Sequence, residues 1–217
     1  DVTTVCTNKW MMGVRNSFII GIASTFLATA LGTVAALGLS RPHMPYKVLI
    51  MAILISPMIV PLIITAAGMF FFYSQLGLTH TFTGLILAHT ALGTPFVVIT
   101  VTATLTGFDT NLIRASQSLG ADTLRTFFKV IMPLILPGVI SGALFAFITS
   151  FDEVVVVLFI GSIEQVTIPI QMWAGLRQET SPVILSMATC LVLLSIALLT
   201  TVELLRRRSE RLRGIKV

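Results

Sequence analysis

The stretch RASQSLGADTLRTFFKVIMPLILPG, Arg114–Gly138, is a polar interruption between two strongly hydrophobic runs. It carries three basic residues, one acid, a glycine in its middle and two prolines four positions apart. A segment of this kind is unusual in a chain that is otherwise rich in apolar residues. The side of the membrane on which it lies, and what it contacts there, therefore decide how the chain works.

The composition indicates an integral membrane protein. The chain has 217 residues, of which 55% are hydrophobic and 11% charged, with a mean hydropathy of +0.98, too few charges for the surface of a soluble domain. The net charge of +5 comes from basic residues beside apolar runs, so it indicates membrane topology and not nucleic-acid binding. Cys6 and Cys190 are isolated and predict neither a disulfide framework nor a metal site.

Five apolar runs are long enough to cross a hydrocarbon core of about 30 Å, which takes about 20 helical residues. They are 17–39, 48–73, 84–105, 138–160 and 182–203. The alternation typical of barrel strands is absent, so the predicted fold class is an all-α polytopic membrane protein formed by one domain, residues 1–217. Pro57 and Pro61 in the second run and Pro95 in the third are expected to be kinks.

The distribution of basic residues predicts the orientation. Eleven of the fourteen fall on one side, namely Arg41, Lys47, Arg114, Arg125, Lys129, Arg206, Arg207, Arg208, Arg211, Arg213 and Lys216. Lys9, Arg15 and Arg177 fall on the other. Because loops rich in Lys and Arg stay cytoplasmic, the C-terminus and the opening stretch are predicted inside and Asp1 outside. We expect a sixth helix before Asp1 in the natural protein.

Residues 109–137 are predicted to form two short helices at an angle. Asp109 and Asp122 can each cap a helix, and Gly120 suits the left-handed position that ends the first one. Pro133 and Pro137 are expected to limit the second helix. An apolar side is predicted from Leu112, Ile113, Leu119, Leu124, Phe127 and Phe128. The pattern alone fits a helix at the lipid headgroups, a structural loop or a helix docked in a groove of a soluble partner.

The same segment resembles the cytoplasmic coupling loop of ABC importer permeases, whose motif runs Glu-Ala-Ala, three residues, Gly and a hydrophobic stretch ending in Leu-Pro. Ala115, Gly120, Phe127, Pro133 and Pro137 fit this motif, while Arg114 replaces its Glu and Ser116 its second Ala. The resemblance implies that the residues coupling the permease to its ATPase are Arg114, Ala115, Ser116, Gly120, Ala121, Asp122, Leu124, Phe127 and Phe128.

Most of the chain shares this resemblance. NSFIIGIASTFLATALGTVAALGLSR is similar to the span that opens the type I, methionine-permease-like fold. LAHTALGTPFVVITVTATLTGFD and SFDEVVVVLFIG look like the spermidine/putrescine permease branch. The resemblance implies a six-span permease of the bacterial inner membrane. Its implied partners are a second permease subunit, giving a heterodimer, two ATP-binding cassette ATPase subunits and a periplasmic substrate-binding protein.

Two acids, Asp152 and Glu153, lie inside the fourth predicted span. A carboxylate at the bilayer centre costs about 2.5–3.5 kcal/mol on insertion scales, so such groups usually face a bundle interior or a watery path. On a continuous helix, neighbouring residues point about 100° apart, so at most one of the two is expected to line a path. They are interpreted either as structural residues or as a transient site for a cationic substrate.

Two further residues are candidates for the substrate pathway. His89 in the third span is either a packing residue or a substrate ligand. Trp173 is either an interfacial anchor or part of an outer lip that faces the binding protein.

The sequence contains no GxxxxGK[ST], HExxH or GxSxG motif, so no catalytic residue, metal or cofactor is predicted, and ATP hydrolysis is assigned to a partner. The favoured substrate is a polyamine such as putrescine or spermidine, or a similar organic cation. Another small solute (opine-like, amino-acid-derived or anionic) is an alternative, as is a secondary carrier or channel.

Overall fold

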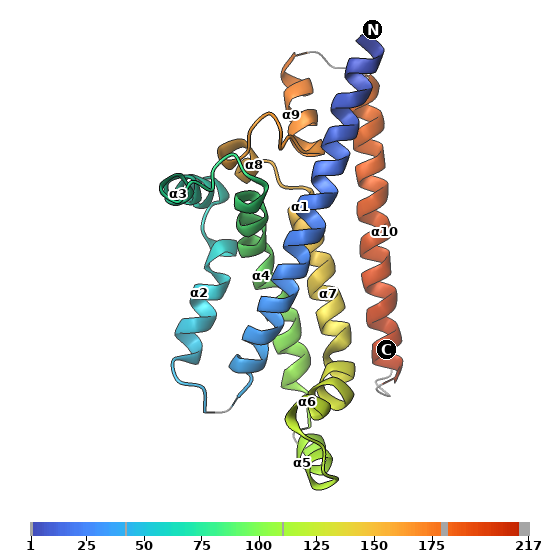
Figure 1. Ribbon diagram of the computed structural model, residues 1–217. Coiled ribbons are helices and arrows are strands. Elements are labelled where there is room, and N and C mark those ends of the chain that lie inside the picture. The colour runs from blue at the N-terminus through green and yellow to red at the C-terminus, as the bar shows by residue number, and fades with distance from the viewer. Residues whose placement is uncertain (1, 42, 110, 179–181, 213–217) are drawn as a thin grey trace.

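The computed structural model describes residues 2–41, 43–109, 111–178 and 182–212, and all regular elements in these ranges are helices (Figure 1). In chain order they are α1 (Val2–Leu39), α2 (Lys47–Ile59), α3 (Leu62–Gln75), α4 (Phe82–Thr106), α5 (Asn111–Ser118), α6 (Thr123–Thr126), the π-helical turn η1 (Phe127–Ile131), α7 (Met132–Phe151), α8 (Val155–Ile160), α9 (Ile168–Gln178) and α10 (Pro182–Leu212). The predicted all-α class is confirmed.

The centre of the bundle is formed by α1, α4 and α7, which pack closely on one another. Small residues allow the close approach. A Cβ added to Gly142 on α7 would lie 2.5 Å from Thr100 Oγ1 and 2.8 Å from Val97 Cα, both on α4. A Cβ on Gly93 of α4 would lie 3.0 Å from the Cβ of Ala146 on α7. The two helices therefore leave no room for a side chain at Gly142 and very little at Gly93.

The predicted spans are present, although one is broken. Four helices are long and apolar enough to cross a membrane, and their spanning segments are Lys9–Leu39, Phe82–Thr106, Thr123–Phe151 and Ile184–Thr201. The bent pair α2 and α3 makes a fifth if it is counted as one span. The bend between these two helices is 105°, so the expectation of a mere kink is wrong. Val60 is extended because it precedes Pro61, and a residue before proline disfavours the helical conformation.

The fourth span differs from its prediction at both ends. Helical structure begins at Thr123 and runs through α6, η1 and α7 to Phe151, whereas a helix over 138–160 was expected. Pro133 and Pro137 do not limit the helix. Pro133 is the second residue of α7 and directly follows the π-helical turn, where the amide of Met132 donates to the carbonyl of Phe127 five residues back, so the regular α-helical bonding pattern is already interrupted there. Pro137 removes one helical hydrogen bond, which a membrane helix tolerates when its neighbours satisfy the freed carbonyl.

Beyond Phe151 the chain leaves the helix for three residues and then forms the short helix α8. The next loop is tied to α1, because the side-chain amide of Asn16 donates to the carbonyls of Glu164 at 2.8 Å and Val166 at 3.0 Å. Ser17 Oγ accepts from the amide of Ile168, the first residue of α9, at 2.9 Å. These bonds hold α9 beside the N-terminal half of α1, at the end of the bundle opposite α5 and α6 (Figure 1).

Candidate functional site

The two helix breaks meet at an open cavity of about 780 Å³, here called the break cavity. One wall is the α2–α3 break, Pro57–Leu62, and the opposite wall is the α7–α8 break, Asp152–Val155. Leu92 and Phe96 of α4 and Ile148 and Thr149 of α7 complete the lining. Irregular backbone at membrane depth is tolerated where it is buried in protein or lines a water-filled cavity, so this cavity is the first candidate for a passage.

The two acids at the α7–α8 break have different environments. Asp152 is exposed at the cavity. Glu153 is only 6% exposed, and its carboxylate accepts from the backbone amide of Val156, 2.9 Å from both oxygens, and from that of Val157 at 3.3 Å. Glu153 therefore satisfies the free amides at the start of α8. The premise that both acids sit on a continuous helix is wrong, because the helix ends at Phe151.

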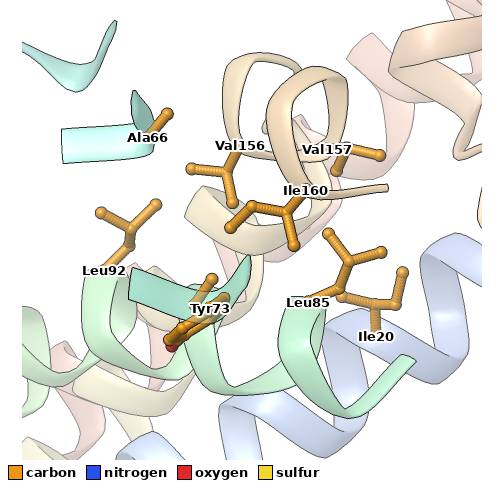
Figure 2. Close-up of a cluster of buried hydrophobic side chains, with 9 residues drawn as sticks. Ile20, Ala66, Tyr73, Leu85, Leu92, Val156, Val157 and Ile160 are labelled. Atoms are coloured by element: carbon orange, nitrogen blue, oxygen red, sulfur yellow. The ribbon is translucent and has the colours of Figure 1, made fainter. Parts of the chain in front are cut away.

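Helix α8 is fixed in place by a cluster of buried apolar side chains. Val156, Val157 and Ile160 pack with residues of α1, α3 and α4, among them Ile20 and Leu85 (Figure 2). The break is also tied to the α3–α4 loop, where the amide of His80 donates to the carbonyl of Ile160 at 2.8 Å. The backbone around Asp152 is thus positioned by packing on one side and by the Glu153 cap on the other.

His89 is a buried network residue and does not line the break cavity. It is 1% exposed, and its Nδ1 lies 2.7 Å from Ser150 Oγ on α7. Ser24 Oγ on α1 donates to the same hydroxyl at 3.0 Å, so the network joins the three central helices. His89 Nε2 lies 3.9 Å from Glu153 Oε2. Sequence reasoning missed Ser24 and Ser150; two hydroxyl residues in apolar spans were the available signal.

Trp173 lies elsewhere. It is 44% exposed on α9, which packs against α1 and α10, and it is not among the residues that line the break cavity. The structure therefore brings Asp152 and Glu153 together with the broken second span, sets His89 behind them, and leaves Trp173 at the end of the bundle where α9 lies.

The predicted caps of the segment 109–137 are present in the structure. Asp109 Oδ1 accepts from the amide of Asn111 at 2.9 Å, and Asp122 Oδ1 accepts from that of Arg125 at 2.7 Å. Gly120 has φ of +81°. Its amide donates to the Gln117 carbonyl at 2.9 Å, and the next amide, that of Ala121, donates to the carbonyl five residues back at 3.1 Å. This double closure is the usual left-handed end of a helix.

One contact in this segment was not anticipated. Ser116 Oγ on α5 lies 3.0 Å from Thr126 Oγ1 on α6, and Thr126 is 2% exposed. The two short helices are therefore joined by a hydroxyl pair as well as by the turn. Ser116 is also a position where the chain departs from the coupling-loop motif, so the departure supplies the donor or acceptor of this bond.

The outer surface of the segment is apolar with a basic border. Exposed fractions are 89% for Leu119, 69% for Leu124, 64% for Phe128 and 43% for Leu112. The exposed basic residues here are Arg114, Arg125 and Lys129, and Ala115 is exposed as well. Phe127, by contrast, is half-buried and faces inward with Ile113 onto a second cavity, which the side of Leu124 also lines. The apolar residues are thus divided between two sides of the segment and do not form one face.

Residues 28–211 match the family described as the binding-protein-dependent transport system inner membrane component. The chain belongs to this family. As a permease of this kind it is a multi-pass protein of the inner membrane. It works with an ATPase and a substrate-binding protein, and ATP is hydrolysed in the separate ATPase subunit.

Individual relatives agree with this assignment. The permease is 30% identical over 195 residues to the spermidine/putrescine transport system permease protein PotC of Haemophilus influenzae, a match that covers 90% of this chain and 76% of the relative. With PotC of Escherichia coli K12 it shares 29% over 211 residues, 93% of this chain and 80% of the relative. The osmoprotective compounds uptake permease protein GgtD of Synechocystis is 32% identical over 168 residues, which cover 76% of this chain and 56% of that protein.

Solved structures confirm the fold of the permease. The MetNI methionine ABC transporter in an inward-facing conformation matches with a TM-score of 0.69 and 21% identity, covering 98% of both chains. An amino acid ABC transporter matches with a TM-score of 0.69 and 17% identity, covering 95% of this chain and 97% of that one. The permease therefore has the type I ABC importer permease fold that the sequence resemblance implied.

Proposed function

We propose that the permease forms half of a passage for an organic cation of the polyamine class, and that the break cavity is part of this passage. The observation that carries the proposal is the exposed carboxylate of Asp152 in the break cavity. The residues that line this cavity include two ionisable side chains, Asp152 and Glu153, and both are acids. The relatives named for spermidine and putrescine transport support the same substrate class.

The chemistry of the cavity suits a flexible diamine. Pro57, Met58, Leu92 and Phe96 supply apolar walls, along which the methylene chain of a polyamine can pack. Apolar walls lower the local dielectric constant and so strengthen the attraction between an ammonium group and Asp152. The face of an aromatic ring such as Phe96 also attracts cations. Glu153 is occupied by the amides of α8, so its part is to position the backbone that carries Asp152.

The segment 109–137 is proposed to be the cytoplasmic insert that docks on the ATPase. The residues expected to make or shape this contact are Arg114, Ala115, Ser116, Gly120, Ala121, Asp122, Leu124, Phe127 and Phe128. Its exposed apolar side chains with a basic border fit a helix that binds in a groove of a soluble protein. Phe127 contributes from the inner side, as part of the wall that supports the insert.

A continuous helical rod connects this insert to the break cavity. Thr123–Phe151 is helical throughout and is about 44 Å long at 1.5 Å per residue. One end of the rod belongs to the insert and the other end immediately precedes Asp152. A displacement of the insert by the ATPase would therefore tilt or shift the rod and move the acid. This is our account of how ATPase closure changes the passage.

The remaining partners follow from the same arrangement. A second permease subunit would complete the passage as a heterodimer and cover apolar side chains that α2 and α3 expose, such as Ile53, Ile63 and Phe71. The end of α10 lies on the same side of the bundle as the insert (Figure 1), so the C-terminus is proposed to be cytoplasmic. Trp173, on the opposite side, would then belong to the lip that faces the binding protein.

The test compares two charge-neutral variants in the complete transporter, reconstituted with its partner permease, ATPase and binding protein. Asp152→Asn is expected to lower ATP-driven putrescine uptake by about ten-fold or more, because one charge pair in a medium of effective dielectric constant 20 is worth a few kcal/mol before desolvation. Glu164→Gln removes an exposed acid outside the break cavity and should change uptake little.

Two results would contradict the proposal. Unchanged putrescine uptake in the Asp152→Asn transporter would remove the role of this acid. Uptake of a neutral or anionic solute that does not respond to Asp152→Asn, together with no polyamine uptake by the wild type, would favour the alternative substrate class. GgtD, a relative named for the uptake of osmoprotective compounds, is not named for polyamines either.

A further inference from the structure

A second cavity of about 500 Å³ lies where the insert meets the ends of the spans; we call it the insert cavity. It is bounded by the last residues of α1 and α4 and by α5, α6 and η1. A volume of this size is within the range of small-molecule sites, which is about 300–1,000 Å³. The residues assigned to the passage, Asp152 and Glu153, take no part in it.

The wall and the rim of the insert cavity differ in chemistry. The wall is mainly apolar, with Leu37, Leu105, Phe108, Phe127 and Ile131, while Gln117, Thr123 and Thr126 add uncharged polar groups on the side of the insert. The rim includes Ser40 and Arg41, directly beyond the end of α1. Among the described residues that line the cavity, Arg41 is the only charged one. It is exposed, and within the described part of the chain it forms no ion pair.

We propose that the insert cavity binds an anionic phospholipid, with its phosphate on Arg41 and an acyl chain along the apolar wall. The cavity lies at the ends of two membrane spans, Lys9–Leu39 and Phe82–Thr106, which is the level of the lipid headgroups. Basic pockets between membrane helices at the cytoplasmic surface suit anionic headgroups. A water-soluble phosphate compound would satisfy Arg41 but would leave the hydrocarbon wall uncovered.

The position of the site suggests what the lipid does. It would fill the space between the end of α1 and the inner side of the insert, where Ile113 and Phe127 face. Binding would therefore support the angle at which the insert leaves the membrane. Naming the cytoplasmic leaflet rests on the proposed orientation of the insert, whereas lipid binding itself depends on neither the substrate nor the direction of transport.

The experiment measures lipid retention by native mass spectrometry of the assembled transporter, supplied with phosphatidylglycerol or with phosphatidylcholine. The wild type is expected to retain phosphatidylglycerol preferentially. Arg41→Gln should weaken its binding about five-fold, the effect of one basic residue at a membrane surface. Lys47→Gln is the matched control, because Lys47 is an exposed cation at the start of α2 and outside the cavity.

A second variant tests the apolar wall without a change of charge. Leu37→Trp should fill the cavity and lower phosphatidylglycerol retention while Arg41 stays in place. Glycerol phosphate, which lacks acyl chains, should not displace the lipid. Equal retention in the wild type, Arg41→Gln and Leu37→Trp would overturn the proposal. So would retention that appears only after the ATPase is removed, because the cavity would then belong to a protein partner, or full displacement by glycerol phosphate.

Discussion

Replacement by alanine should destabilise the permease much more at Glu153 than at the neighbouring acid Asp152. Glu153 holds the amides of Val156 and Val157 in a buried position, while Asp152 is exposed. Loss of a cap costs about 0.5–2 kcal/mol, and a buried donor left unpaired costs about 1–3 kcal/mol. Because these two costs overlap, we expect Glu153→Ala to lower the free energy of unfolding by about 2 kcal/mol.

For a chain of this length, about 2 kcal/mol corresponds to a fall of about 4–8 °C in Tm. Asp152→Ala should stay within about 0.5 kcal/mol of the wild type. The assay is the thermal unfolding of the purified transporter followed by tryptophan fluorescence, with the monodisperse fraction as a second measure. Glu153→Gln keeps one acceptor oxygen and should fall between the two alanine variants.

Cation uptake should respond to the two acids in the opposite order, with the larger loss on replacement of Asp152. Asp152→Ala should lose cation transport with its stability intact, whereas Glu153→Gln should retain part of both. Equal losses of Tm for Asp152→Ala and Glu153→Ala would refute the division of roles between the two acids. An unchanged Tm for Glu153→Ala together with abolished uptake would make Glu153 the substrate-facing acid instead.

Three further variants test other parts of the structure. Gly120→Val should uncouple ATP hydrolysis from uptake, because φ at Gly120 is +81° and a side chain in the left-handed conformation costs about 1–2 kcal/mol. Gly107→Val is the control, since Gly107 has φ of −93° and open space around it. An unchanged ratio of hydrolysis to uptake in Gly120→Val would oppose a role of Gly120 in coupling. Gly142→Ala should lower the free energy of unfolding by about 1–3 kcal/mol through its clash with α4, whereas Gly38→Ala, with no atom within 4 Å, should be tolerated. Equal Tm values for the two variants would contradict the close packing. A double-mutant cycle of Ser116→Ala and Thr126→Val should give a coupling energy of about 0.5–1.5 kcal/mol, and additive effects on Tm would argue against their hydrogen bond.

Local signals carried most of what the sequence predicted correctly. Span length and hydropathy located the membrane helices because a bilayer sets the length of an element. The caps at Asp109 and Asp122 and the left-handed Gly120 were predictable because each depends on a few adjacent residues. No sequence signal of this kind revealed the angle between α2 and α3, which depends on packing in three dimensions as well as on Pro61.

The break after Phe151 was missed for a different reason. The run Val154–Ile160 is as apolar as α7 before it, so hydropathy alone predicts a single span over both segments. An acid directly before an apolar run is also the pattern of a helix start, and Glu153 was that signal. The prolines led to the opposite error. Pro133 and Pro137 were expected to limit the second helix of the insert, but helical structure continues through η1 and α7 and includes both prolines.

Photochemical cross-linking from the insert in the assembled transporter shows whether the insert contacts the ATPase. Leu119→Cys, in a background with Cys6 and Cys190 replaced by serine, is labelled with a benzophenone reagent, and Ile163→Cys at the far end of the bundle serves as the control, since both side chains are almost fully exposed. We predict that the label at 119 attaches to the ATPase subunit and that the label at 163 does not. Attachment of the 119 label to lipid or to the binding protein alone would contradict the proposed coupling of the insert to the ATPase.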